Sequence, residues 1–194
     1  MKNILTTRLP KSINVQNQEI EIYTDFKKWI EFEIELENDL VSKDKIRSLI
    51  NLVKEKNKIN ETNIEEVVDK LLLFYNCGEK NSNESANNKQ MYSFNKDQYL
   101  VYTDFIRFYD IDLSEADMHW WKFKKLFVEL PSGSSTKEAM KFRCVQITSK
   151  MSQEQRIYYS KMKRLYSLEK DISVSKKQAR FGSVLFSGMN IKHD

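Results

Sequence analysis

The 194-residue sequence is long enough for one well-packed domain with a tail and rarely supports two. Only four glycines and two prolines accompany 31% charged residues, which disfavours β-sandwiches and barrels because those folds need frequent turns. The net charge is +4, with the basic excess in the C-terminal half, and no apolar run approaches the roughly 20 residues of a membrane span. We therefore expect no membrane partner and a mainly α fold: one helical-bundle-like domain over residues 1–170, of about six to seven helices.

Residues 9–23 alternate apolar and polar side chains around a polar centre, and this pattern predicts a short N-terminal β-hairpin. Because an isolated hairpin is marginally stable in water, it should pack on helices or offer its edge to another chain. Thr24 is the predicted N-cap of a first helix. Residues 30–37 also alternate like a strand, but their glutamates and the length of the segment favour the helix.

Two more helices are predicted before the middle of the chain. One begins at Ser42. The next begins at Thr62-Asn63-Ile64-Glu65, which reads as a capping box, and ends at Gly78, which suits a left-handed helix end. Residues 79–91 are almost wholly polar and predict a flexible loop.

The second half predicts further helices separated by clear breaks. One starts at Ser93 or Asn95 and carries an aromatic stripe. A second is capped by residues 114–117 and broken by the Pro, Gly and Ser residues of 131–135. A third starts at Thr136.

Residues 152–155 form another predicted capping box, which opens a helix where tyrosines and cations interleave. This composition suits single-stranded nucleic acid, and it equally suits an amphipathic helix whose lysines extend over the edge of a core. The basic tail, residues 171–194, has no periodicity and should be poorly ordered without a partner. The predicted partner-binding residues lie in the hairpin and in this helix: Ile20, Ile22, Tyr158, Tyr159, Lys161, Lys163, Arg164 and Tyr166.

The most distinctive stretch is residues 118–123, which contain two of the three tryptophans and one of the two histidines. On a helix these residues would be apolar on nearly every side. Such a segment is either a base-stacking or cofactor platform or a part of the core buried between several helices, and we favour the core. The predicted structural hub consists of Met118, His119, Trp120, Trp121, Phe123 and Phe127.

No catalytic, cofactor or metal site is predicted. Residues 110–121 begin like a calcium-binding loop, but Glu115 stands at the glycine position and Trp121 at the position of the bidentate glutamate. Cys77 and Cys144 form no C-x-x-C pair and read as buried apolar residues in a reducing compartment. Motifs of nucleotide-binding proteins, serine hydrolases and zinc proteases are missing, so we expect a protein that is not an enzyme.

Around the tryptophan pair the sequence resembles the bacteriophage gene-product-fifteen family, small proteins of tailed phages and prophages. The most specific stretch is Met-His-Trp-Trp-Lys-Phe-Lys-Lys-Leu-Phe-Val-Glu-Leu at residues 118–130. The likeness continues in residues 74–78, 109–113 and 158–168, and in the hairpin leading into Thr-Asp-Phe. It covers roughly residues 9–168.

The resemblance implies a role in phage tail morphogenesis. Genes of the family commonly lie between those of the major tail protein and the tape measure protein, where tail-assembly chaperones are encoded. The expected partners are therefore phage tail proteins, above all the tape measure protein, in the bacterial host cytoplasm during assembly, with a homo-oligomer possible. A nucleic-acid-binding accessory protein that uses the basic C-terminal half and a minor structural virion protein are the alternatives.

Overall fold

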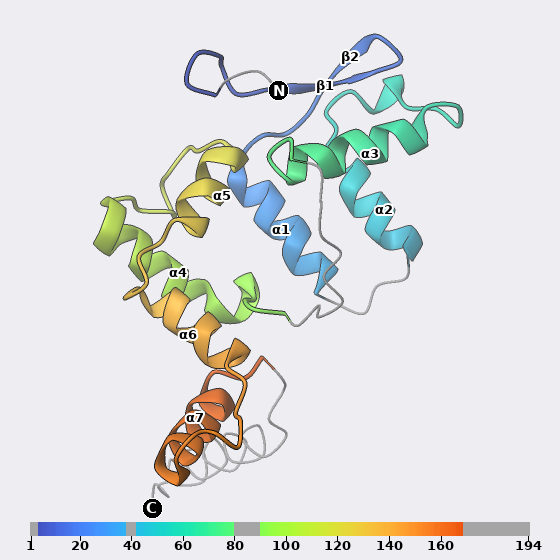
Figure 1. Ribbon diagram of the computed structural model, residues 1–194. Coiled ribbons are helices and arrows are strands. Elements are labelled where there is room, and N and C mark those ends of the chain that lie inside the picture. Colours follow the sequence, from blue (N-terminus) through green and yellow to red (C-terminus); the bar gives the residue numbers. More distant parts are fainter. Residues whose placement is uncertain (1–3, 38–41, 80–89, 169–194) are drawn as a thin grey trace, which may run out of the picture. The chain divides into compact units, whose positions relative to one another are not determined.

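The computed structural model describes residues 4–37, 42–79 and 90–168 (Figure 1). Within these ranges the chain forms seven α-helices, one short 3-10 helix and one two-stranded antiparallel sheet, so the prediction of a mainly α fold with an N-terminal hairpin is confirmed. Most of the predicted loop 79–91 and all of the predicted tail 171–194 lie outside the described residues.

The chain divides into two compact units, residues 1–144 and 145–194. The first contains the hairpin and six helices, and the second contains the helix α7 (Gln153–Leu165). The single domain expected over residues 1–170 stays a prediction. The helices of the first unit are α1 (Phe26–Leu36), α2 (Ser42–Ile50), α3 (Ile64–Tyr75), α4 (Phe94–Tyr109), α5 (Trp120–Val128) and α6 (Ser135–Cys144), with the 3-10 helix η1 (Lys56–Lys58) between α2 and α3.

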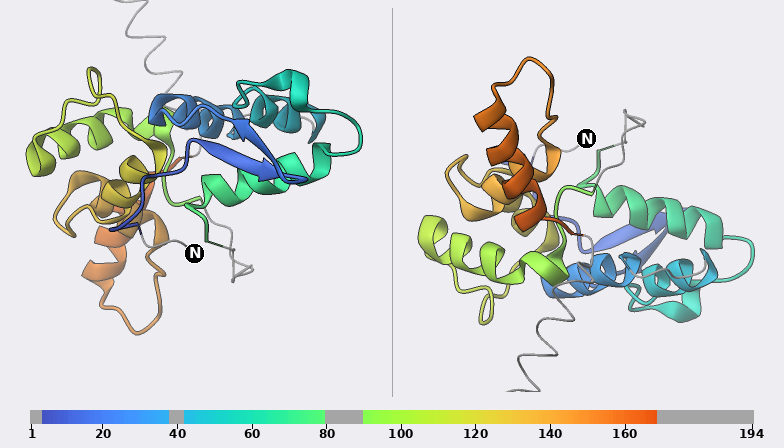
Figure 2. Two further views of the ribbon diagram at one scale, coloured as in Figure 1. Left: turned by 90° about the horizontal axis from the view of Figure 1, so that it is seen from above. Right: turned by 90° about the horizontal axis from the view of Figure 1, so that it is seen from below.

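The hairpin consists of β1 (Ser12–Val15) and β2 (Gln18–Glu21), with Ile13 paired to Ile20. Its two turn residues, Gln16 and Asn17, both have positive φ, which gives a type I′ turn whose twist matches that of the strands. β1 packs on α3, and the two run side by side in Figures 1 and 2. The hairpin is therefore stabilised by the helical layer, as its marginal stability in isolation requires.

Two predicted helix caps are wrong, because other side-chain hydrogen bonds form at these helix starts. At α1 the N-cap is Asp25, whose Oδ1 accepts from the Lys27 backbone N–H at 2.6 Å. At α3 the Thr62 hydroxyl donates to Asn60 Oδ1 at 2.7 Å, and the N-cap is Asn63, whose side chain makes no hydrogen bond to the first turn of the helix. The competing hydrogen bonds of Asn and Thr side chains thus displaced the predicted capping box.

The start of α5 also differs from the prediction. Residues 114–117 do not cap it, because Ser114 donates from both its backbone N–H and its hydroxyl to Asp112 and closes a separate turn. The helix begins at Trp120 with His119 as N-cap. In contrast, α4 has Ser93 as its N-cap, one of the two starts that were predicted, and the predicted capping box Ser152–Gln155 of α7 is confirmed.

The core of the first unit is aromatic and centred on α5. The Phe123 ring stacks against Phe26 and Phe105, with centroids 4.9 and 5.2 Å away, and Trp120 stacks on Trp29 at 6.0 Å. All five side chains are almost completely buried. Stacked rings of this kind add to the free energy gained from burying apolar area. α5 is therefore the element around which α1 and α4 are assembled.

A buried ion pair joins α6 to α4. Arg143 donates to both carboxylate oxygens of Asp97, at 2.6 and 2.7 Å, and also to the Met91 carbonyl at 3.0 Å. Asp97 accepts in addition from the Ser93 backbone N–H at 3.0 Å. Because a bidentate pair with further hydrogen bonds leaves little charge unsatisfied, both residues can be buried.

Candidate functional site

The structural hub meets the C-terminal end of α3, where helix carbonyls lack intrahelical partners. The Trp120 indole N–H donates to the Tyr75 carbonyl at 3.0 Å, and the Trp121 indole N–H donates to the Phe74 carbonyl at 2.7 Å. Lys124 adds a second donor to the Tyr75 carbonyl at 3.0 Å. The tryptophan pair therefore contributes hydrogen bonds to the helix end as well as bulk to the core.

The backbone completes this helix end as a Schellman motif. The Gly78 N–H donates to the Leu73 carbonyl at 2.8 Å, and the Cys77 N–H donates to the Phe74 carbonyl at 2.9 Å. The predicted left-handed conformation of Gly78 is confirmed, with φ of 78°. Cys77 is left-handed too, with φ of 57°, and it occupies the position in which glycine is usual. Buried Cys77 agrees with the prediction, whereas Cys144 is exposed and corrects it.

His119 holds the start of α5 through both ring nitrogens. Nδ1 accepts from the Trp121 backbone N–H at 3.1 Å, and Nε2 lies 2.9 Å from the Pro10 carbonyl. Only a neutral ring protonated on Nε2 makes both bonds, because Nδ1 must keep its lone pair. Burial lowers the pKa of His119, which favours the same neutral form.

A second polar group lies beside the hub. Glu33 of α1 is buried and accepts from the Tyr75 hydroxyl at 2.6 Å and the Tyr92 hydroxyl at 3.1 Å. Burial raises the pKa of Glu33 and lowers that of the nearby Lys124. In the sequence Glu33 is one of several glutamates in the alternating segment 30–37, so nothing there separates it from its exposed neighbours.

Most of the hub lies in the core. Met118, Trp120, Phe123 and Phe127 are buried, and His119 and Trp121 are half-buried with their polar atoms engaged in the hydrogen bonds above. Among the described residues, no group of three or more His, Cys, Asp or Glu side chains is arranged to hold a metal ion.

The hairpin side chains predicted to bind a partner are corrected by the structure. Ile20 and Ile22 are fully buried and belong to the hydrophobic core that the hairpin shares with the helices. The outer edge of β2 is also covered: Ile22 bridges Val53, and the Lys54 N–H donates to the Glu21 carbonyl at 3.0 Å. These two isoleucines are core residues, and their side chains are inaccessible to a partner.

The other predicted partner-binding residues lie together on α7 and its C-cap, Tyr166. None of the helix's residues, all of which the structure describes, is buried. Ile157 is 62% exposed, Leu165 is 68% exposed and Tyr158 is half exposed. Lys161 and Arg164 are exposed as well, while Lys163 donates to the Val145 carbonyl at 2.8 Å and Tyr158 packs edge-on against Tyr159. The residues missed from the sequence are the two exposed aliphatic residues of this helix, Ile157 and Leu165, which lie beside the predicted tyrosines and cations.

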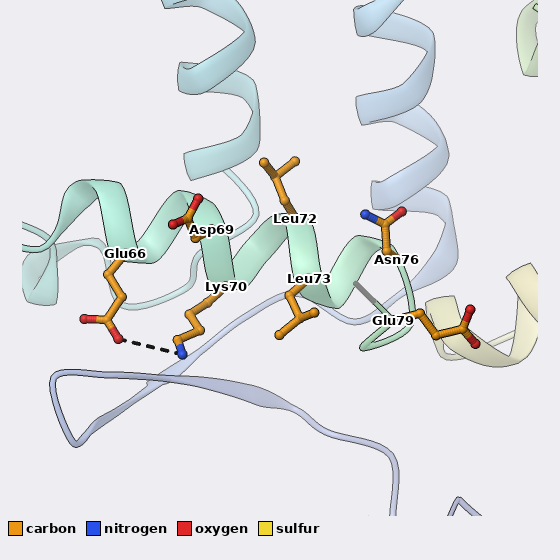
Figure 3. A pocket seen from close by; sticks show the side chains of 7 residues that line it. All are labelled: Glu66, Asp69, Lys70, Leu72, Leu73, Asn76 and Glu79. Atoms are coloured by element: carbon orange, nitrogen blue, oxygen red, sulfur yellow. Dashed lines mark ion pairs between the residues drawn. The ribbon is translucent and has the colours of Figure 1, made fainter. Parts of the chain in front are cut away.

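A groove of about 400 Å³ runs along α3 (Figure 3), but its charges are largely paired within the chain. The Lys70 Nζ atom lies 3.8 Å from Glu66 Oε1, and this ion pair is drawn in the figure. The Lys125 Nζ atom lies 2.7 Å from Glu79 Oε1. The groove is lined by Glu66, Asp69, Lys70, Leu72, Leu73, Asn76 and Glu79. It presents no set of convergent polar groups for a small ligand, so α7 is the stronger candidate surface.

Comparison with known protein families gives a match over most of the chain. A family model described as bacteriophage Gp15 protein matches residues 5–168, which include the hairpin, the hub and α7. No curated protein and no solved structure matches the chain. Over the described ranges, none of the helices is both long and apolar enough to pass through a bilayer.

Proposed function

The chain belongs to the bacteriophage Gp15 family, and on that premise we propose that it is a non-enzymatic factor of phage tail morphogenesis, a tail-assembly chaperone that binds the tape measure protein. Family membership supports the phage setting. The role in tail assembly is inferred by analogy, from the usual position of the family's genes beside the tape measure gene.

The structural observation that supports this proposal is the exposure of α7. Ile157 and Leu165 each leave most of their apolar surface in water, and both lie on a helix that buries none of its own residues. Large apolar side chains concentrated on one helix commonly mark a protein-binding surface. A chaperone needs such a surface, since it must cover apolar residues of its client before the client is assembled.

Co-expression with the tape measure protein of the same phage tests the proposal. We expect the chain to raise the soluble yield of that protein and to co-elute with it. A double variant, Ile157→Ser with Leu165→Ser, should lose both effects, while Ile106→Ser, which changes an exposed isoleucine on α4, should keep them. Unchanged solubility and the absence of a complex with the wild-type chain would refute the chaperone role.

A nucleic-acid-binding role is the second candidate, because tyrosines and cations interleave on α7. It predicts DNA affinity at about 100 mM salt that falls steeply as salt rises. No binding at low salt would exclude it. A structural role in the virion instead predicts that mass spectrometry detects the chain in purified phage particles.

A further inference from the structure

We propose that α7 binds an acidic amphipathic helix, whose apolar residues cover Ile157 and Leu165 and whose carboxylates face Lys161 and Arg164. This inference deepens the proposed function, on which it rests for the identity of the client, by stating the chemistry of the segment that is bound.

The geometry comes from helical spacing. Ile157, Lys161 and Leu165 are four residues apart, so they follow one another along a single face of α7. We call these three residues the α7 seam. Its two apolar ends are separated by about 12 Å along the helix axis. A second helix laid along the seam can place apolar residues two turns apart over Ile157 and Leu165, which is how a helix fills an apolar surface.

The positive charge of α7 favours a partner that carries carboxylates. α7 contains four basic residues and one acidic residue, Glu154. Lys161 lies within the seam itself, between the two apolar side chains, and Arg164 flanks Leu165. A partner that covers the apolar pair therefore approaches both cations, and carboxylates at the matching positions favour binding.

The same features disfavour other occupants. A second copy of α7 would bring its own lysine and arginine against those of the first, and like charges oppose that pairing. Nucleic acid stacks on aromatic rings, whereas the most exposed apolar residues here are the aliphatic Ile157 and Leu165. A helix lying on a lipid surface keeps its cations on the polar side, whereas Lys161 interrupts the apolar face.

Two synthetic helical peptides test the inference with the full-length chain. Both have roughly three heptads with identical Ile and Leu positions, and one carries Glu and the other Lys at the flanking e and g positions. Each peptide is repelled by its own copies, so it remains available for binding. We expect the chain to bind the Glu peptide at least about tenfold more tightly than the Lys peptide in fluorescence anisotropy at low salt.

Variants then assign the binding to the seam. Lys161→Glu should weaken binding of the Glu peptide and strengthen binding of the Lys peptide. The double variant Ile157→Ser with Leu165→Ser should bind the Glu peptide about tenfold or more weakly than the wild type. The control Ile106→Ser should bind like the wild type. Because none of these side chains is buried, the variants should keep the wild-type circular dichroism and melting temperature, which separates lost binding from lost folding.

Several results would overturn the inference: equal binding of both peptides, or a double serine variant that binds the Glu peptide like the wild type. Seam-dependent self-association, or tighter seam-dependent binding of oligo-dT or of phosphatidylglycerol vesicles, would also overturn it and assign α7 to another partner. The two proposals fail separately. Tape measure protein that stays bound to the double serine variant refutes this inference alone, whereas peptide binding without a tape measure complex refutes the chaperone role alone.

Discussion

The end of α3 allows a quantitative test of what the tryptophan pair contributes. The Tyr75 carbonyl accepts from two donors, the Trp120 indole N–H and the Lys124 ammonium, both at 3.0 Å. Trp120→Phe removes the first donor and keeps a ring in the core. Lys124→Met removes the second and keeps an unbranched stem over the Tyr75 and Trp120 rings, where the ammonium now lies.

Either single change leaves the carbonyl with one partner, whereas the double change leaves it with none. An unsatisfied buried polar group costs about 1–3 kcal/mol, while a satisfied hydrogen bond contributes about 1 kcal/mol net. We therefore expect the double variant to be destabilised by about 1 kcal/mol more than the sum of the two single variants. The volume lost in Trp120→Phe and the charge lost beside Glu33 occur in the single variants too, so they cancel in the cycle.

Urea denaturation followed by circular dichroism at 222 nm measures the free energies of unfolding of the wild type, the two single variants and the double variant without relying on tryptophan fluorescence. Trp120→Ala gives the scale: the side chain is fully buried, so its removal should cost about 3–5 kcal/mol. Trp121→Ala should cost less, because Trp121 is half-buried. A coupling below about 0.3 kcal/mol would mean that the two donors act independently and would refute the shared-carbonyl argument.

Three other predictions follow from the buried polar groups. The pKa of His119 lies below its ordinary value, so the unfolded chain binds more protons than the folded chain. The stability that the neutral ring contributes should be complete above about pH 6.5 and should decline as the pH falls below that value. His119→Asn should flatten this pH dependence in melting curves recorded from about pH 5 to 8. Asp97→Asn or Arg143→Met alone should lower the free energy of unfolding in urea by about 3–5 kcal/mol, because each leaves a buried charge without its partner. A double variant whose loss of stability equals the sum of the two single losses would contradict the pairing. A thiol reagent should label exposed Cys144 quickly in the native protein and Cys77 only after unfolding. Burial blocks access to the Cys77 thiol and raises its pKa, so little reactive thiolate forms. Equal labelling rates would place Cys77 at the surface.

The sequence predicted the elements of the fold well, because period and composition are local properties of the chain. Alternation around residues 16–17 identified the hairpin, and helical preference correctly resolved the ambiguous segment 30–37. The errors lie at helix starts. There a competitor such as Asn60 or Asp112, which no pattern singles out, takes the hydrogen bond that the predicted cap needed.

The candidate surface was only partly predictable. The tyrosine and cation pattern located α7, but whether its apolar side chains face a core or solvent depends on tertiary packing. The same limit explains the error at Ile20 and Ile22, whose hairpin edge is paired with residues 52–54 from beyond the next two helices. The indole N–H bonds to the end of α3 join residues about 45 positions apart, a separation that periodicity cannot detect.

The Arg143–Asp97 ion pair has a mechanical consequence. The division between the two units follows Cys144, so Arg143 is the penultimate residue of the first unit. Tension applied to the second unit would enter the first unit at the C-terminal end of α6, where two hydrogen bonds from Arg143 to Asp97 join this helix to α4. Peeling α6 from its C-terminus would therefore require breaking this buried ion pair near the start of the process.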